Sequence, residues 1–298
     1  RRNMKMKRNR TTGIICNIFF ILFSITFIVP FLYIISISLT DESYIIQHGY
    51  SLLPKQLSTA AYSYVFANMT QLVNSYVVTI ISSLAVALGG TFIMALLAYP
   101  LSVKEFAARR VITFLVFFTM LFGGGMMASY IVNTQILGLG DSIWIYILPA
   151  LVTPYYVIIL RSNFSGLPSS LVEAAEIDGA GEYRVFFQII LPLSKPVLAT
   201  VALLTLLAKW NDWTTAMIYI RNNRLFSLQY LLQKYLNEAA FLKQMSDIAP
   251  ANMTSNITTP SESLKFAMVV IATGPALVIY PFFQKYFAKG MTIGAVKG

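Results

Sequence analysis

One polar and aromatic stretch inside an apolar segment has the clearest binding chemistry in this sequence. Lys209 and Asp212 are three positions apart, so on a helix they share a face and can form an ion pair. Trp210, Asn211 and Trp213 surround them with aromatic faces and an amide, which suit a sugar ring and its hydroxyls. Ionisable groups inside a membrane span usually face a bundle interior or an aqueous cavity, which favours a position lining a pathway. The alternative is a structural polar pair near the membrane interface with two belt tryptophans, and the residues alone leave both open.

A second stretch, too short and too charged to cross a membrane, combines residues that start and end helices. Ser170 and Glu173 have the S-x-x-E spacing of a capping box, which predicts a short helix over residues 171–178. Gly179 and Gly181 are predicted to end it, because glycine readily takes the left-handed conformation found at helix ends.

A second short helix is predicted over residues 182–190, followed by Pro192 and Pro196, which redirect the chain into the next span. Its apolar side consists of Val185, Phe186, Ile189 and Ile190. The two helices make an elbow whose small residues, Ala174 and Ala175, allow a partner to approach closely. The alternative is an interfacial helix pair that covers the membrane surface without a specific partner.

Catalytic and metal-binding chemistry is poorly represented. The only cysteine is Cys16 and the only histidine is His48, which excludes an internal disulfide and leaves no plausible zinc site or nucleophile–histidine pair. The phosphate-binding pattern G-x-x-x-x-G-K-[ST] is absent. We therefore predict no catalytic residue, no metal site and no cofactor in this chain, so that any energy from ATP comes from another chain.

The composition indicates a membrane protein. Of 298 residues, 57% are hydrophobic and 11% charged, and the mean hydropathy is +0.67, whereas a soluble domain is about 25% charged. Six segments reach the roughly 20 apolar residues that a spanning helix needs. They cover residues 11–40, 75–99, 111–136, 142–160, 196–220 and 266–283. Gly274-Pro275 and Pro281 predict a bend or break in the sixth.

The basic residues predict the orientation of these spans. Six spans place both termini on one side, and the tails and loops of that side hold 15 Lys and Arg against 6 on the other. The positive-inside rule assigns the richer side to the cytoplasm, and it explains the net charge of +10 without nucleic acid. The sequence therefore divides into a cytoplasmic basic tail over residues 1–12, a first span with an outer loop over residues 13–68, a core of five spans over residues 69–288, and a cytoplasmic tail over residues 289–298. The core includes the elbow over residues 168–192 and an outer loop over residues 221–262.

The elbow resembles the coupling motif of ATP-binding-cassette (ABC) importer permeases. The matching residues are Glu173, Ala174 and Ala175, then Gly179, then Ile189, Leu191 and Pro192. Residues 289–298, 191–196 and 209–213 are similar to maltose-type carbohydrate permeases. Gly123, Gly124 and Gly125 are similar to the branch of that group that imports larger oligosaccharides. The chain thus resembles a type I ABC importer permease with a MetI-like transmembrane domain.

This resemblance implies an all-α membrane protein of six spans that pairs with a second permease, most often a different chain. Two ATPase subunits, which bind ATP and magnesium, dock beneath, and an extracellular binding protein delivers the sugar. The assembly would lie in the cytoplasmic membrane of a bacterium, surrounded by lipid, without nucleic acid.

The resemblance also assigns roles to particular residues. Glu173, Ala174, Ala175, Asp178 and Gly179 would enter a cleft on an ATPase, and Ile189, Leu191 and Pro192 would join the elbow to the fifth span. The tail with Lys289, Gly290, Gly294 and Lys297 would reach the ATPase dimer interface; the alternative is a basic end without a partner.

Two further segments allow more than one interpretation. The run Gly123 to Gly125 weakens a helix by up to about 1 kcal/mol per glycine, which predicts an unwound segment of a pathway, a close helix contact, or simply the outer end of the span. The outer connection over residues 221–262 is long enough to be functional and, by resemblance, would face the binding protein. The alternative is a surface lid.

Three other classes compete with this interpretation. An ABC permease for a non-sugar solute would share the coupling motif. A secondary transporter would show inverted repeats, which the sequence lacks. A membrane enzyme or sensor would need a catalytic group or an additional domain.

Overall fold

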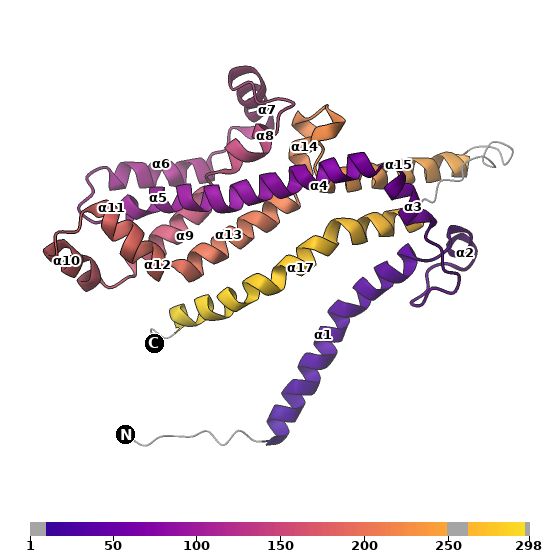
Figure 1. The fold of residues 1–298 in the computed structure, drawn as a ribbon, viewed down its shortest axis with the longest axis horizontal. Coiled ribbons are helices and arrows are strands. Elements are labelled where there is room, and N and C mark those ends of the chain that lie inside the picture. Colours follow the sequence, from indigo (N-terminus) through magenta and orange to yellow (C-terminus); the bar gives the residue numbers. More distant parts are fainter. Residues whose placement is uncertain (1–9, 249–261, 296–298) are drawn as a thin grey trace. The chain divides into compact units, whose positions relative to one another are not determined.

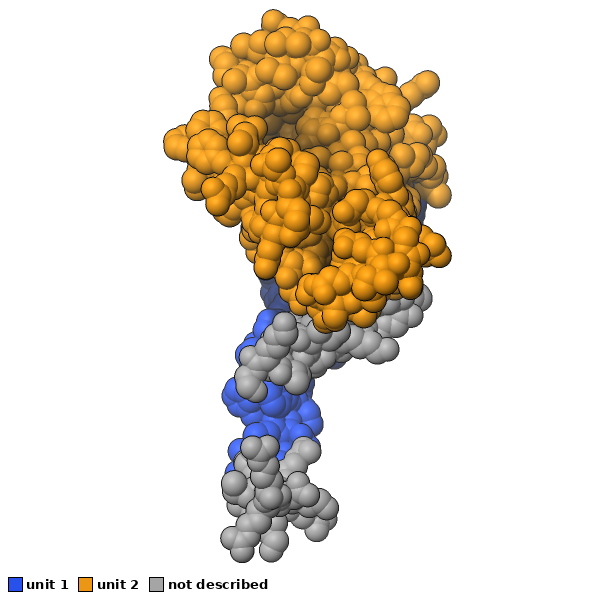
Figure 2. All heavy atoms as spheres, turned by 90° about the vertical axis from the view of Figure 1, so that its left-hand side faces the viewer, with its two compact units in different colours: residues 1–68, 234–271 blue, residues 69–233, 272–298 orange. Residues whose placement is uncertain are grey.

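The computed structural model describes residues 10–248 and 262–295, whose regular structure is helical apart from an isolated bridge between Thr40 and Leu57 (Figure 1). The chain forms two compact units (Figure 2). The first comprises residues 1–68 and 234–271, and the second comprises residues 69–233 and 272–298. Helices α15 (Leu228–Ile248) and α17 (Glu262–Ala295) contribute residues to both.

In the first unit, α1 (Arg10–Ser38) corresponds to the first predicted span, and α2 (Glu42–His48) and α3 (Ala60–Ala67) follow. The apolar side chains of α1 are largely exposed, as expected of a surface that meets lipid or a partner. The Glu42 carboxylate accepts hydrogen bonds from the backbone N–H groups of Glu262 and Ser263, both at 2.9 Å. A negative charge at a helix N-terminus is favourable, so Glu42 stabilises the start of α17.

The second unit contains the elbow and the spans around it. Its helical segments are α4 (Met69–Leu84), η1 (Ala85–Gly90), α5 (Thr91–Ser102), α6 (Arg109–Leu121), α7 (Gly125–Ile131), η2 (Val132–Ile136), α8 (Trp144–Ile147), η3 (Leu148–Ala150), α9 (Pro154–Ser165), α10 (Ser169–Ile177), α11 (Glu182–Val185), η4 (Phe186–Ile190), α12 (Leu191–Leu193), α13 (Lys195–Trp210), α14 (Thr214–Tyr219) and η5 (Asn223–Leu225). Of these, η1, η2 and η4 are π-helical turns, and η3 and η5 are 3₁₀ turns.

The main core of this unit forms where α5 packs on α9. Met94, Ala95 and Ala98 are fully buried on one side of α5, at the three- and four-residue spacing of a helix face. Val157 and Leu160 of α9 pack against them. Helix α13 in turn packs on α4, η1 and α5, so the helices that lead to the elbow share one packed body.

The predicted spans are partly bent. Gly13–Ser38 and Met69–Ser102 are long and apolar enough to cross a membrane by themselves. Three bent pairs of helices raise the count to five in the part of the chain that the structure describes, with bends of 113° between α6 and α7, 44° between η3 and α9, and 77° between α12 and α13. The third predicted span, residues 111–136, therefore consists of two helices, and the chain leaves the helix at residues 122–124, where the glycine run predicted an interruption.

The fifth and sixth predicted spans also need correction. α13 ends at Trp210 and α14 begins only at Thr214, so the fifth span does not continue as a helix to residue 220. α17 passes through Pro275 and Pro281 as one helix, so the predicted break does not occur in the sixth span, while the alternative of a bend stays a prediction. Of the outer connection, residues 228–248 form α15, and residues 249–261 lie outside the described residues.

Candidate functional site

The first helix of the elbow, α10, ends just before Gly179, as predicted. Gly179 has a φ of 77°, its N–H donates to the Glu176 carbonyl at 3.0 Å, and the Ala180 N–H donates to the Ala175 carbonyl at 2.9 Å. These two bonds form a Schellman motif, in which the left-handed residue follows the helix end. Gly181 was predicted to help end α10, and this was wrong. It has an ordinary φ of −76° and is the N-cap of α11.

The start of α10 differs from the prediction. The helix begins at Ser169, two residues early, with Pro168 as its N-cap and no side-chain capping bond. Ser170 thus lies inside the helix, and the predicted capping box with Glu173 does not form. The physical reason is that the fixed φ of proline already suits the entry into a helix.

The second half of the elbow is more irregular than the predicted helix over residues 182–190. α11 is one turn long and continues as the π-helical turn η4 into α12. Val185, Phe186 and Ile190 are buried in the core with α5 and α9, while Ile189 is half-buried. The predicted apolar side is therefore confirmed, and Pro192 and Pro196 flank the 77° bend into α13.

The elbow contacts helices that come earlier in the chain, α5 and α9, in addition to leading into α13. The Tyr99 hydroxyl of α5 donates to the Glu182 carboxylate at 2.5 Å, and the Tyr99 and Phe186 rings lie 5.2 Å apart. The half-buried Ala175, Ala180 and Leu191 also pack on the core of α5 and α9. One side of the elbow is thus fixed to the helical body.

The opposite side of the elbow is free in this chain. Glu173, Ala174, Asp178 and Gly179 are exposed. Large apolar and aromatic side chains lie among them, and Ile177 is 87% exposed and Tyr183 82% exposed. Exposed apolar groups mixed with carboxylates are typical of a protein-docking surface. This suits four of the five residues assigned to a partner cleft, whereas the fifth, Ala175, packs on the core side.

A cavity of about 470 Å³ lies at the other end of α13. Its lining includes four of the five predicted pathway residues of this segment, namely Lys209, Asn211, Asp212 and Trp213. Three threonines and a tyrosine complete its polar wall: Thr205 from α13 itself, Thr214 from α14, and Thr153 and Tyr156 from the start of α9. Sequence reasoning missed Thr153 and Tyr156 because they come from a separate segment that only the fold brings close. Thr205 lies one helical turn before Lys209, and this spacing could have indicated it.

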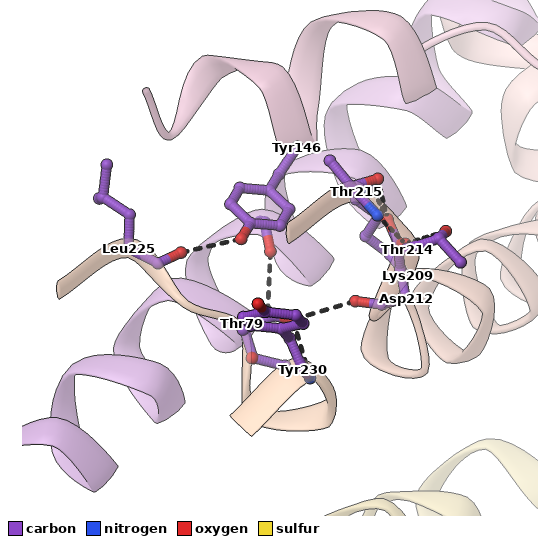
Figure 3. A network of polar contacts seen from close by, with 10 residues as sticks. Thr79, Tyr146, Lys209, Asp212, Thr214, Thr215, Leu225 and Tyr230 are labelled. Atoms are coloured by element: carbon purple, nitrogen blue, oxygen red, sulfur yellow. Dashed lines mark hydrogen bonds and ion pairs between the residues drawn. The ribbon is translucent and has the colours of Figure 1, made fainter. Parts of the chain in front are cut away.

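Lys209 and Asp212 form the predicted ion pair, with 2.6 Å between Nζ and Oδ2, and both side chains are largely buried. Asp212 nevertheless lies after the end of α13, where its carboxylate also accepts from the Thr215 N–H at 3.0 Å and the Thr214 hydroxyl at 3.0 Å (Figure 3). The contact was predicted from helix spacing. The short loop after Trp210, which holds Asp212, could not be predicted from the sequence, apart from the two threonines that follow it.

Tyr146 is a further member of this network that the sequence did not reveal. It is 1% exposed, its ring lies 5.5 Å from Lys209 Nζ, and its hydroxyl donates to the Leu225 carbonyl at 2.8 Å (Figure 3). A cation over an aromatic face is attracted to it, so Tyr146 helps to fix the lysine at the cavity wall.

Two predicted groups do not line the cavity. Trp210 is 3% exposed and its indole N–H donates to the Ala272 carbonyl at 3.2 Å, so it is a packing residue. Gly123, Gly124 and Gly125 are exposed at the 113° bend between α6 and α7. The predicted unwound segment is confirmed there, and a close helix contact is not, because added Cβ atoms would meet at most Ala128 of the following helix.

The C-terminal tail continues the last helix. Lys289, Gly290 and Gly294 belong to α17. Lys297 lies outside the described residues.

Comparisons with known proteins give one consistent picture. A family model described as the binding-protein-dependent transport system inner membrane component matches residues 59–293. Protein LplC from Bacillus subtilis (strain 168) is 42% identical over 291 residues, which cover 95% of this chain and 94% of that protein.

Two further relatives carry transport names. The polygalacturonan/rhamnogalacturonan transport system permease protein YtcP from the same organism is 36% identical over 295 residues. This match covers 98% of this chain and 100% of that protein. A bacterial ABC transporter involved in the import of the acidic polysaccharide alginate contains a chain with a TM-score of 0.77 and 28% identity. That match covers 94% of this chain and 98% of the other.

Proposed function

Because this chain belongs to the family of binding-protein-dependent transport system inner membrane components, we propose that it is the permease subunit of an ABC importer for an oligosaccharide. The names of the relatives support this substrate class, since YtcP is a polygalacturonan/rhamnogalacturonan permease and the structural neighbour imports alginate. Family membership also removes the secondary-transporter alternative. The uptake experiment described below distinguishes a sugar from a non-sugar solute.

The proposed arrangement in the membrane is six spans with both termini in the cytoplasm. The fifteen Lys and Arg on one side against six on the other support this orientation. The bent pairs would each act as one span with a broken helix, which is tolerated where the break is buried in protein or faces a cavity. The elbow then lies on the cytoplasmic side, and the outer connection over residues 221–262 faces the binding protein.

The proposed partners are a second permease, two ATPase subunits, an extracellular binding protein and the surrounding lipid. No cofactor is held by this chain, and ATP and magnesium bind to the ATPases. The observation that carries the proposal is the two-sided elbow, whose buried side is fixed to α5 and α9 and whose exposed side presents Glu173, Ala174 and Asp178. A part that is rigid on one side and free on the other transmits a push from a partner to the helical body.

Helix α13 would carry that push to the cavity. It has 16 residues and runs without interruption from the 77° bend to Trp210, a length of about 24 Å at the rise of an α-helix. Its far end bears Lys209, which lines the cavity with Asn211 and Trp213. A rigid-body tilt of α13 would therefore change the access to the cavity, which is how alternating access would reach the sugar.

Uptake by intact cells tests both the substrate class and the cavity. Cells from which the gene for this chain has been deleted would express either the wild type or the Trp213→Ala variant. Uptake of oligogalacturonides, arabinooligosaccharides and an amino acid would then be measured. We expect the wild type to restore uptake of one of the oligosaccharides only. Loss of the stacking surface of Trp213 should lower that uptake roughly 2- to 10-fold.

Trp144→Ala is the matched control, because Trp144 is 55% exposed and does not line the cavity. It should leave uptake unchanged. Uptake of the amino acid that depends on this chain would contradict the sugar assignment. Full uptake by Trp213→Ala would contradict the assignment of the cavity to the pathway.

A further inference from the structure

A second cavity, of about 800 Å³, lies at the start of α6 and has a strongly basic wall. Lys104, Arg109 and Arg110 from the α5–α6 connection and α6, and Arg161 from α9, contribute four cations. Glu105 is the single carboxylate among its lining residues, so positive charges exceed negative ones by three. This cavity is separate from the sugar cavity and has no role in the function proposed above.

The cations of this cavity are available to a ligand. None of the four forms an ion pair with a carboxylate anywhere in residues 10–248 and 262–295. Arg161 uses its Nε–H to donate to the Leu101 carbonyl at 2.9 Å, which fixes the guanidinium at the wall and leaves its remaining donors for a ligand. The planar guanidinium fork matches the geometry of phosphate oxygens.

One buried polar atom points to the same kind of ligand. Thr113 lines the cavity, and its hydroxyl oxygen is buried without a hydrogen-bond partner among the described residues. Buried hydroxyls in folded proteins nearly always have a partner. A phosphate oxygen in the cavity would supply one.

Beside its basic wall, the cavity has an apolar exit. Phe114 lines it and is 64% exposed, and Val111 and Leu115 on the same helix are 63% and 53% exposed. None of the residues of α6 is buried in this chain. A ligand that fits both parts carries an anionic group and an apolar chain, which describes an anionic phospholipid and not a free anion.

The cavity lies at the end of the second unit that carries the elbow. The Ser165 hydroxyl of α9 donates to the Ser102 carbonyl of α5 at 3.5 Å, and the Tyr99 hydroxyl of α5 donates to Glu182 of the elbow at 2.5 Å. In Figure 1 the connection between α5 and α6 lies at the same end as α10 and α11. A basic cluster followed directly by an apolar helix is the pattern expected where a span meets the headgroup layer.

We propose that this cavity binds the phosphate of an anionic phospholipid, with the acyl chains along the exposed side of α6. With the orientation given under the proposed function, the lipid belongs to the cytoplasmic leaflet, where basic pockets between spanning helices bind such headgroups. The lipid would hold the α5–α6 connection next to the elbow.

Binding of single lipids to the purified, assembled transporter tests this proposal by native mass spectrometry. The probes are phosphatidylglycerol, phosphatidylcholine and inorganic phosphate. Wild-type transporter should bind phosphatidylglycerol in preference to both others. Arg109→Gln combined with Arg110→Gln should weaken that binding about 30-fold, because each cation near an anionic membrane surface contributes about 1 kcal/mol.

Two variants act as controls. Arg109→Lys with Arg110→Lys keeps both charges and should retain most of the binding. Lys55→Gln with Arg224→Gln removes two exposed cations outside the cavity and should leave it unchanged. Equal affinity for phosphatidylcholine, equal binding of inorganic phosphate, or an equal loss in the Lys55/Arg224 variant would overturn the proposal. If the Arg109/Arg110 glutamine variant fails to assemble, the preference of the wild type among the three probes still decides it.

Discussion

Gly90 is placed where no side chain fits. A Cβ atom at this position would lie 2.9 Å from the Leu151 carbonyl oxygen, closer than real Cβ contacts. Gly90→Ala should therefore force η1 and the segment after η3 apart and cost about 1–3 kcal/mol, as overpacking of a tight contact does. Thermal unfolding of the purified complex measures this effect.

The neighbouring glycine provides the control. A Cβ at Gly89 would meet only the Leu151 Cδ2 atom, at 3.9 Å, so Gly89→Ala should be neutral or slightly stabilising. A similar loss in both variants would show that the backbone contact at Gly90 is not the cause.

Asp141 is the residue whose titration the structure connects to stability. Its φ is 55°, and its carboxylate accepts from the backbone N–H groups of Asn222 at 2.8 Å and Arg221 at 3.0 Å. These bonds, with that of Asn222 the strongest, hold the pKa of Asp141 below its ordinary value of 3.8. Because the pKa is lower in the folded state, the stabilisation is complete above the unfolded-state pKa and is lost as the pH falls through the folded-state pKa.

Asp141→Asn should remove this dependence while tolerating the positive φ, which asparagine adopts readily. Thermal stability measured between about pH 5 and pH 3 should fall more steeply for the wild type than for the variant. Identical acid slopes would contradict the role of the two backbone donors.

Among the elements, the elbow was the most predictable because its boundaries depend on local chemistry. Gly179 marks the end of α10, and the spacing of Val185, Phe186 and Ile190 marks the buried side of the next turn. The start of α10 was missed because Pro168 competes with the serine as the first cap. The π-helical turn η4 was not predicted, because the buried residues Val185, Phe186 and Ile190 have four- and five-residue spacings that differ little from those of an α-helix.

The cavity was less predictable than the elbow because it is assembled from several elements. Helix spacing predicted the contact of Lys209 with Asp212, but no glycine or proline marks the end of α13 at Trp210. Trp210 and Trp213 look equivalent in sequence, and only the packing around α13 buries one and exposes the other. Tyr146 comes from α8, more than sixty positions earlier in the chain, so local patterns contain no trace of its approach to Lys209.

The end of α10 gives a prediction at this scale. Gly179→Ala places a Cβ at a φ of 77°, which costs about 1–2 kcal/mol, and should speed hydrogen exchange in residues 169–190 by roughly 5- to 30-fold. Gly181→Ala is the control, because the φ of Gly181 is −76° and a Cβ there meets nothing within 4 Å. Unchanged exchange in Gly179→Ala would show that the Schellman motif does not hold the elbow.

For the whole molecule, the proposed orientation makes the elbow and the first outer loop lie on opposite sides of the membrane. In a Cys16→Ser background, Ile177→Cys and Leu53→Cys place single thiols at positions that are 87% and 75% exposed. A membrane-impermeant maleimide should label the Leu53→Cys variant in intact cells, and the Ile177→Cys variant only after the cells are opened. Labelling of the Ile177→Cys variant in intact cells would reverse the orientation.

The central claim is that the exposed side of the elbow couples ATP hydrolysis in partner subunits to movement of the sugar. Glu173→Lys changes one exposed charge on that side, so the variant should insert and fold normally. Lys55→Glu is the matched control, a charge reversal at an exposed position off the elbow.

The most direct measurement is ATP hydrolysis and oligosaccharide uptake in the same reconstituted vesicles, with and without the loaded binding protein. Glu173→Lys should lose at least about tenfold of the stimulated hydrolysis and of the uptake, the equivalent of about 1.4 kcal/mol, while Lys55→Glu retains both. Normal stimulation and uptake by Glu173→Lys would contradict the account, because the elbow would then be a surface helix pair without a coupling role.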